Sequence, residues 1–461
     1  MFERAVLILK ILCLLILAGL VLTTLTGCDS TNPLDPRNPV TLALWHPYGQ
    51  QMGTAIEELI EEFNHTVGAE QGIIVQTTYI ADASELNDRL LAAVNDDPGA
   101  PDFPDIAIIY PRVGIILAEN DLLLDLSTQF SEEEISRYVP SFIEEGRFSD
   151  DDTLYILPIA KSTEVLYVNT TIFDRFAADT GVTLSRLATF EGLIDVAEKY
   201  YVWSGGKDFI HMREMFNLAM TGFHQLGEDF LANEEPNFSS HVYERIWSVY
   251  YPRAVQGGVA IFEGYGNYLI ATGEAVCDYG TSASIIFYPD TVTYSDNTKE
   301  DLVLAILPQP VFEGGEKVAL QRGGGLCIFK SNTGKEYAAG VFLKWLTDPE
   351  QNLRFIAQNG YLPVMEAAFN EFLQKGLDIV EDPNVMNVHE TLIQMKREYS
   401  FYFPPTFDGY DEIRRNYNRT MMKEAENSRQ EFLSLLDEHD PETAFKIASE
   451  YALEQFKSAM R

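Results

Sequence analysis

Strand-like and helical patterns of apolar residues alternate through the first part of the chain after Pro39. Alternating apolar residues in VTLALW predict a strand. Behind it, Thr54 is the predicted N-cap of a helix, with Glu57 as its capping-box partner and apolar residues at helical spacing afterwards. Such an order of strands and helices predicts a parallel sheet covered by helices. In chain order the expected elements are a strand at 40–45, a helix from 54, a strand at 73–79, a helix at 86–94 and a strand at 105–110.

The stretch Leu157–Asn169, LPIAKSTEVLYVN, is predicted to cross between two lobes. A proline-containing turn leads into a polar Lys-Ser-Thr triplet, and an apolar strand follows at Val165–Val168. Taken alone, the stretch fits better with a surface turn that feeds an ordinary strand. Its neighbours along the chain favour the crossing.

The second half of the chain combines helical segments with short glycine-rich turns. Phe209–Leu226 is apolar at helical spacing, and Lys335–Thr347 predicts a helix with one apolar face. Between them, Leu302–Leu307 predicts a strand, and the triple glycine in QRGGG permits close backbone approach to a ligand or to the neighbouring lobe. The turn Gly280–Ser284 is either an oxygen-binding loop or an ordinary turn.

Composition narrows the class of protein. With 461 residues, the chain exceeds what one compact core usually holds, so two lobes are expected. Apolar residues make up 46% and charged residues 22%, values typical of a globular protein. Because 70 acidic residues face 33 basic ones, for a formal charge of −37, nucleic-acid binding is excluded.

The N-terminus reads as an export signal. Residues 1–27 have a basic start and an apolar run that is short for a membrane span, and they end in Leu-Thr-Gly before Cys28. This ending looks like a bacterial lipobox, in which Cys28 would be lipidated; an uncleaved anchor helix is the alternative. Residues 28–39 contain several prolines and are expected to be a tether. Both alternatives place the protein outside the cytoplasm.

Two cysteines remain in the mature chain. Cys277 and Cys327 lie far apart in separate apolar segments, and no zinc-like spacing is present. Cysteines in such segments are more often small buried hydrophobic residues than disulfide partners. We expect free thiols and no metal site.

Five candidate site residues follow from the predicted sheet. Ligands of parallel α/β sheets bind beyond the carboxyl ends of the strands. For Trp45 and Tyr110 that position favours ligand contact, because aromatic faces often line small-molecule sites. For His46 alone, a plain loop position or packing between the lobes is the better interpretation. The residues at this edge are Trp45, His46, Tyr48, Glu85 and Tyr110.

Taken together, these segments resemble extracellular solute-binding protein family 1, the receptor subunits of ABC importers for sugars and related solutes. The resemblance rests on the lipobox, LALWHPYGQQMGTAIEELIEEFN, PIAKSTEVLYVN, GGGLCIFKS and, most specifically, KWLTDPEQ with GYLPV. The Trp-His opening and the Lys-Ser-Thr crossing look most like the glycerol-3-phosphate receptors.

The resemblance implies a type II periplasmic-binding fold, an α/β fold with two lobes, a hinge and a ligand cleft between them. Lobe 1 would comprise residues 40–157 and 308–360, and lobe 2 residues 158–307 and 361–461. Positions that line the cleft in family members correspond to Trp45, Glu85, Tyr110, Ser162, Thr163, Ser282 and Gly324.

One feature departs from the glycerol-phosphate receptors. These carry an arginine just before the closing helices, whereas this chain reads PPTFDGYDEIRR, with Arg414 and Arg415 on the following helix. A phosphate would lose its best charge-assisted partner. An oligosaccharide or other polyol is therefore at least as good a candidate ligand as a glycerophosphodiester.

The expected protein is a lipid-anchored, monomeric receptor without catalytic residues or cofactor, which delivers its solute to ABC permease subunits. The alternative is an exported, lipid-anchored hydrolase acting on glycans through paired carboxylates. No serine elbow and no His-Glu-x-x-His pattern supports that alternative.

Overall fold

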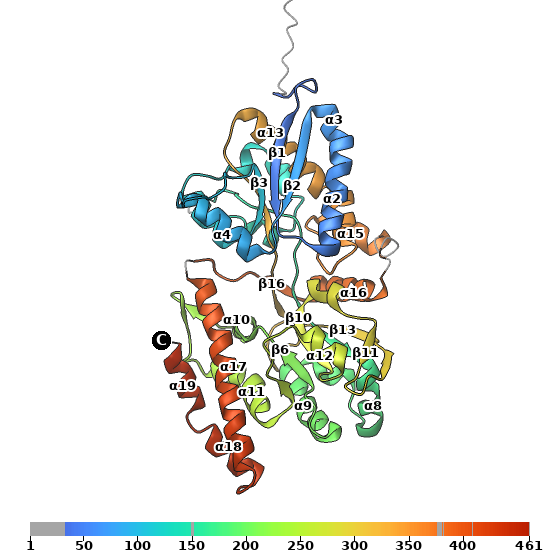
Figure 1. Cartoon of the computed structure of the whole chain (residues 1–461), viewed down its shortest axis with the longest axis vertical. Coiled ribbons are helices and arrows are strands. Elements are labelled where there is room, and N and C mark those ends of the chain that lie inside the picture. Colours follow the sequence, from blue (N-terminus) through green and yellow to red (C-terminus); the bar gives the residue numbers. More distant parts are fainter. Residues whose placement is uncertain (1–32, 149–151, 376–379, 381, 408, 461) are drawn as a thin grey trace, which may run out of the picture.

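Two lobes, each built around a five-stranded sheet, lie one above the other along the long axis of the molecule (Figure 1). The structure is a computed structural model, and it describes residues 33–148, 152–375, 380, 382–407 and 409–460. The predicted signal segment and Cys28 lie outside the described residues. This arrangement confirms the predicted two-lobed α/β fold.

The sheet of lobe 1 contains the predicted strand–helix alternation. Its order is β2-β1-β3-β15-β4, in which β1 pairs in parallel with both β2 and β3, while β15 is antiparallel to β3 and β4. Leu42 and Leu44 of β1 are fully buried, as the alternating pattern predicts. The strands are β1 (Val40–His46), β2 (Ile73–Tyr79), β3 (Ile106–Ile109), β4 (Leu157–Pro158) and β15 (Gly325–Ile328).

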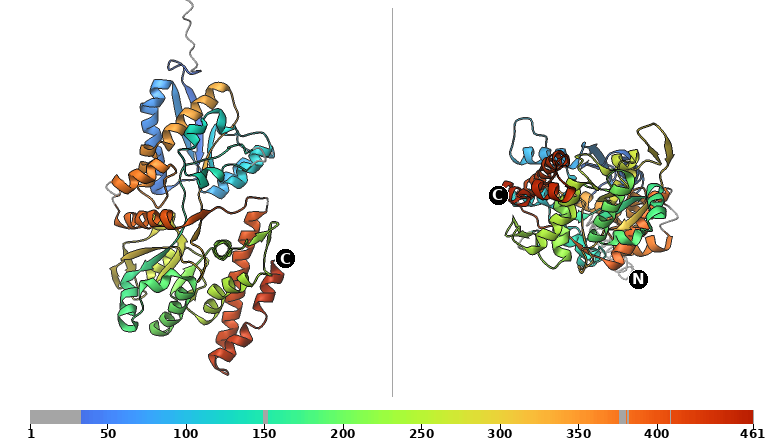
Figure 2. Two further views of the ribbon diagram at one scale, coloured as in Figure 1. Left: turned by 180° about the vertical axis from the view of Figure 1, so that it is seen from behind. Right: turned by 90° about the horizontal axis from the view of Figure 1, so that it is seen from below.

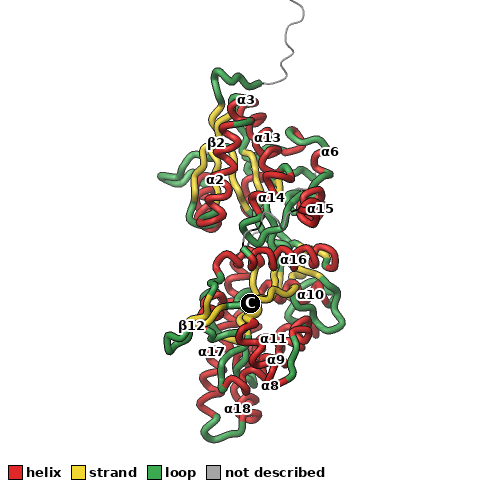
Figure 3. The backbone as a smooth tube through the Cα atoms, turned by 90° about the vertical axis from the view of Figure 1, so that its right-hand side faces the viewer, coloured by secondary structure: helices red, strands yellow, loops and turns green. Residues whose placement is uncertain are grey.

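Helices cover both faces of this sheet (Figures 1 and 3). The predicted cap at Thr54 is wrong, because α2 begins four residues earlier, at Gln50, directly after the extended backbone of Gly49. The helices are α2 (Gln50–His65), α3 (Val67–Gln71), α4 (Ala83–Val94), α5 (Pro111–Glu119), α6 (Glu132–Ile135), α7 (Pro140–Glu144), α13 (Thr333–Thr347), α14 (Pro349–Ile356) and α15 (Glu366–Lys375), with a 3-10 turn, η1, at Leu126–Thr128.

The sheet of lobe 2 has the order β13-β5-β10-β6-β9. Here β5 runs antiparallel to β13 and β10, whereas β10, β6 and β9 are mutually parallel. The expected helix from Phe209 instead starts with a strand, because Ile210–Met212 is buried between two neighbouring strands. The strands are β5 (Glu164–Asn169), β6 (Ile210–Met212), β9 (Val259–Ala260), β10 (Cys277–Thr281) and β13 (Leu304–Pro308).

The helices of lobe 2 include a long C-terminal group, α17 to α19, beside the sheet (Figures 1 and 2). Its core includes Tyr417 of α17 and Phe456 of α19, whose rings pack edge to face at 5.2 Å. The helices are α8 (Thr170–Thr180), α9 (Phe190–Ser204), α10 (Met215–Gln225), α11 (His241–Gln256), α12 (Gly266–Thr272), α16 (Pro383–Glu398), α17 (Tyr410–Leu435), α18 (Pro441–Ala448) and α19 (Ala452–Ala459), with 3-10 turns η2 (Leu184–Ala188) and η3 (Ser282–Phe287).

Three short ladders complete the fold. The parallel pair β14 (Val318–Leu320) and β16 (Ser400–Tyr402) lies between the lobes, as Figure 1 shows for β16. The other two are the antiparallel pairs β7 (Leu231–Ala232) with β8 (Glu235–Pro236), and β11 (Thr291–Thr293) with β12 (Lys299–Asp301). Over the part of the chain that the structure describes, no helix is long and apolar enough to cross a membrane.

The chain crosses between the two sheets where the sequence predicted the first crossing. β4 belongs to the first sheet and β5 to the second, so the Lys-Ser-Thr triplet lies in the connection. Two later connections run beside it, because Ser162 pairs with Arg322 and Lys161 with Leu362 through backbone bridges. Gly323, with φ +114°, allows this close packing, since a Cβ there would lie 2.5 Å from the Ala160 carbonyl oxygen. These three segments form the hinge.

The cysteines lie in different lobes. Cys277 is in β10 and Cys327 in β15, and both are fully buried free thiols, which confirms the prediction. The lobe boundaries expected from the sequence stay a prediction. We note that α15 packs against α14 of lobe 1.

Candidate functional site

The three predicted site residues after β1 lie in the interior of lobe 1. Trp45 is 8% exposed and packs in an apolar cluster with residues of α4 and α5. Tyr48 is equally buried, and its ring lies 5.4 Å from that of Phe355 in α14. His46 is fully buried, and burial lowers its pKa to about 4. Their roles as ligand contacts stay predictions.

Tyr110, Gly324 and Glu85 differ in their surroundings. Tyr110 is the N-cap of α5 and keeps 42% of its surface exposed. Gly324 lies beside the same strand end, since a Cβ there would be 2.9 Å from the Ile109 carbonyl oxygen. Glu85 lies on α4, where its exposed carboxylate pairs with Arg89 at 2.5 Å.

Ser162, Thr163 and Ser282 come together in the hinge. The Ser282 hydroxyl donates to the Gly360 carbonyl oxygen at 2.6 Å and accepts from the Thr163 backbone N–H at 3.4 Å. Ser162 exchanges backbone hydrogen bonds with Arg322 at 2.8 and 2.9 Å. All three residues are buried, with at most 5% of their surface exposed. These contacts tie the three hinge segments together.

Arg322 of the second hinge segment forms an ion pair with Glu164, the first residue of β5 in lobe 2. Arg322 donates from Nη1 to Glu164 Oε1 at 3.0 Å, and Asn217 of α10 donates to the same oxygen at 3.0 Å. Burial alone would lower the pKa of Arg322, but the carboxylates of Glu164 and Glu214 raise it, and the net result is a raised pKa. Burial also raises the pKa of Glu164, against the opposing effect of Arg322. The pair is therefore held in a partly dehydrated environment.

A second ion pair lies at the start of α10. Glu214 accepts from Arg414 of α17 and from Asn418, each at 3.0 Å. Burial would raise the pKa of Glu214, but Arg414, Arg322 and Arg213 together lower it. The carboxylate is thus ionised and surrounded by guanidinium groups.

Arg112 and Asp411 form an ion pair between the lobes. Arg112 on α5 of lobe 1 contacts Asp411 on α17 of lobe 2 at 2.6 Å, and Asp411 also contacts Arg414 at 3.4 Å. Burial raises the pKa of the Tyr110 phenol; Arg322 and Arg414 oppose this rise, while Glu145 and Asp411 add to it. We call the set Arg112, Glu164, Glu214, Arg322, Asp411 and Arg414 the interlobe belt. It combines three guanidinium groups with three carboxylates beside an exposed aromatic ring.

Most of the belt was missed by the sequence analysis. Arg322 stood in the QRGGG stretch, where only the glycines were considered. Arg414 was expected on the helix after the position of the missing arginine; that helix begins at Tyr410, and its first turns lie at the lobe junction. Glu214 is the second residue after the carboxyl end of β6, so the strand-end rule would have found it once β6 was recognised.

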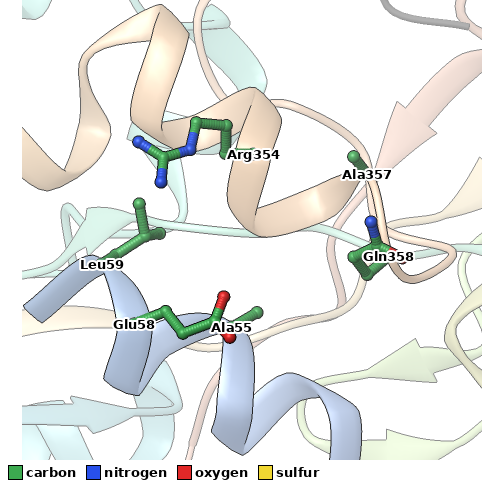
Figure 4. Close-up of a pocket in the computed structure, with 6 residues that line it drawn as sticks. All are labelled: Ala55, Glu58, Leu59, Arg354, Ala357 and Gln358. Carbon is green, nitrogen blue, oxygen red and sulfur yellow. The ribbon is translucent and has the colours of Figure 1, made fainter. Parts of the chain in front are cut away.

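Other surface features lie away from the belt. A pocket of about 180 Å³ opens between α2 and α14, and Figure 4 shows its lining residues Ala55, Glu58, Leu59, Arg354, Ala357 and Gln358. It contains none of the predicted site residues. Within the described ranges, no group of three or more His, Cys, Asp or Glu side chains is placed to hold a metal ion.

Comparison with known proteins agrees with this architecture. Residues 58–387 match the family described as "Bacterial extracellular solute-binding protein". No curated protein sequence matches the chain significantly.

Among solved structures, the cyclic alpha-maltosyl-1,6-maltose binding protein from Arthrobacter globiformis is similar, at 16% identity and a TM-score of 0.64, over 91% of this chain and 100% of that one. An ABC substrate-binding protein from Listeria monocytogenes, in complex with cycloalternan, has 16% identity and a TM-score of 0.66, over 91% and 100% of the chains. UgpB from Mycobacterium tuberculosis, in complex with glycerophosphocholine, has 17% identity and a TM-score of 0.63, over 91% and 99%. These likenesses show the fold, and the family match covers well over half of the sequence. The chain belongs to the bacterial extracellular solute-binding proteins.

Proposed function

We propose that the protein is the receptor of an ABC importer and binds an uncharged, polyhydroxylated solute between its lobes. The observation that carries the proposal is the interlobe belt, which gathers side chains from both lobes around the exposed ring of Tyr110. A ligand can drive lobe closure only if it makes different contacts in the open and closed states. Groups on both sides of one junction meet that requirement.

The charge balance of the belt favours an uncharged ligand. Each guanidinium group already has a carboxylate partner, at 2.6 Å for Arg112 and at 3.0 Å for Arg322 and Arg414. A phosphate would have to compete with these carboxylates, whereas hydroxyl groups can accept from arginine and donate to carboxylate. An aromatic face beside them suits the apolar side of a sugar ring. Sugars and other polyols therefore fit better than glycerophosphodiesters.

The proposed contacts revise the list from the sequence. Tyr110 and Arg322 are the leading contacts, with Glu214 and Arg414 facing them from lobe 2. Ser162, Thr163 and Ser282 are assigned to the hinge, since their hydroxyl or backbone groups hold its segments. Closure would then be a hinge motion about residues 158–163, 321–324 and 360–362.

We further propose that Cys28 carries a lipid and that residues 28–39 tether the lobes to the outer face of the cell membrane. The solute would pass from the closed receptor to ABC permease subunits. The receptor would act as a monomer, since one chain supplies both lobes and the hinge.

A thermal-shift screen tests the proposal. The mature protein is screened against mono-, di- and oligosaccharides, polyols and glycerophosphodiesters, and each hit is incubated with the protein and analysed by mass spectrometry. A ligand at 100 times its Kd should stabilise the fold by about 2.7 kcal/mol. A hit among uncharged sugars or polyols that stays chemically intact is expected. A hit only among phosphodiesters would contradict the proposed ligand class, and consumption of the hit would favour the hydrolase.

A further inference from the structure

Four exposed aromatic side chains gather on lobe 2 at the edge of its sheet. Phe262, Tyr265 and Tyr268 come from the loop after β9 and the start of α12, and they are 37%, 61% and 59% exposed. Phe287, at the end of η3, is 50% exposed. The Asn267 side chain joins the two segments by donating to the Phe287 carbonyl oxygen at 2.9 Å. We call these four residues the aromatic shelf; α12 is labelled in Figure 1.

The shelf lies at the same sheet edge as the lobe 2 part of the belt. Strands β6, β9 and β10 are parallel, so their carboxyl ends meet at one edge. β6 leads into Arg213 and Glu214, β9 leads into the loop with Phe262, and β10 leads into η3. This is the edge at which parallel α/β sheets bind ligands.

Arg213 connects the shelf to the belt. Its guanidinium lies 4.2 Å from the centre of the Tyr265 ring, in a cation–π contact. Its charge also lowers the pKa of Glu214, the neighbouring belt residue. The shelf is therefore continuous with the proposed binding site.

A buried network fixes the loop that carries the shelf. His211 contacts the Phe262 carbonyl oxygen at 3.1 Å and Asp278 at 3.0 Å, and Tyr288 donates to Asp278 at 2.6 Å. Gly266 starts α12 against the Asp278 carboxylate, where a Cβ would lie 2.0 Å away. Exposed aromatic rings on a fixed backbone can bind a ligand at low cost in conformational entropy.

We infer that the aromatic shelf is an extension of the binding site that stacks additional sugar rings of an oligosaccharide whose first rings lie in the belt. The inference rests on the proposed function. Uncharged sugar rings fit the shelf because each presents an apolar face to stack on an aromatic ring and hydroxyl groups that can reach Arg213 or solvent. A ligand of one or two rings would leave the shelf empty.

Calorimetry with short and long probes tests this inference. The di- and hexasaccharides of the malto, cello and manno series are titrated into the wild-type protein and into Tyr265→Ala and Phe287→Ala. In the series that binds, the hexasaccharide should bind the wild type about tenfold more tightly than the disaccharide, and each variant should lose most of that advantage. Disaccharide affinity should stay unchanged. Tyr451→Ala, which removes an aromatic side chain 62% exposed next to α19, is the matched control and should bind as wild type.

The outcomes separate the two proposals. Equal affinity of the wild type for both lengths, or variants that keep the full advantage of the hexasaccharide, would overturn the shelf while leaving the belt as the site. A wild type that binds none of the saccharides at either length would overturn the sugar ligand itself. Variants with normal hexasaccharide affinity but impaired uptake in cells would make the shelf a permease contact and would also overturn the inference.

Discussion

The ammonium group of Lys161 is a buried charge in the hinge. Its side chain is 2% exposed, and it donates to Glu145 at 2.9 Å and to the Gly323 carbonyl oxygen at 3.0 Å. Glu145 is in lobe 1 and Gly323 is in the second hinge segment, so one side chain fixes two parts of the junction. Lys161→Met keeps a side chain of similar length and removes the charge.

The expected loss of stability is large. Removing one partner of a buried ion pair leaves the other charge uncompensated, which costs about 3–5 kcal/mol. Gln321 still donates to Glu145, so the lower end of this range is expected. The double variant Lys161→Met/Glu145→Leu should recover much of the loss, because no unpaired charge remains.

Urea unfolding followed by tryptophan fluorescence measures these differences. Lys330→Met is the control, because Lys330 pairs with Asp121 at the surface, with side chains 43% and 89% exposed. An exposed pair contributes about 0–1 kcal/mol. If Lys161→Met destabilises the protein no more than Lys330→Met, the hinge does not depend on a buried ion pair and this reasoning is wrong.

Three other predictions concern single groups. Cys277 and Cys327 should react with a thiol reagent only after denaturation without reductant, since burial raises the pKa of both thiols, for Cys327 to about 12; a reactive native thiol would contradict their burial. Burial lowers the pKa values of His46 and His389 to about 4. Below pH 6.5 the unfolded chain therefore binds more protons than the folded one. The free energy of unfolding should fall by up to about 3 kcal/mol for each ring as the pH drops from 6.5 to 4. In urea unfolding, the free energy of unfolding of His46→Phe should fall less over this pH range than that of the wild type. An equal fall in both proteins would refute the prediction. Cys28→Ser should abolish lipidation and release the protein from membranes of expressing cells, whereas unchanged retention with an intact precursor would favour an anchor helix.

The sequence was sufficient for the fold because the fold follows from repeated local patterns. Buried alternation marked β1, and a continuous apolar run marked β5 at the first crossing. The start of α2 was misplaced because Thr54 and Glu57 imitate a capping box, while the actual cap, Gly49, has no side chain to recognise. Similarly, β6 was read as helix because three buried residues are too few to show a period.

The site was harder to predict because it depends on contacts between distant segments. Arg112 and Asp411 are about three hundred residues apart in the sequence, yet they form an ion pair between the lobes. Trp45 follows the strand-end rule, but its side chain turns into the core beneath α4. A strand pattern gives the position of a residue at an edge, and only packing decides whether the side chain faces the core or the junction.

The measurement that tests the central claim most directly is calorimetric titration of the screened ligand into two variants, one in each lobe. Tyr110→Ala removes the exposed ring of lobe 1, and Glu214→Ala removes a carboxylate of the belt in lobe 2. If the solute is held between the lobes, both variants should bind at least about tenfold more weakly than wild type while remaining folded. Wild-type affinity in either variant would show that the solute is not held by both lobes at this junction.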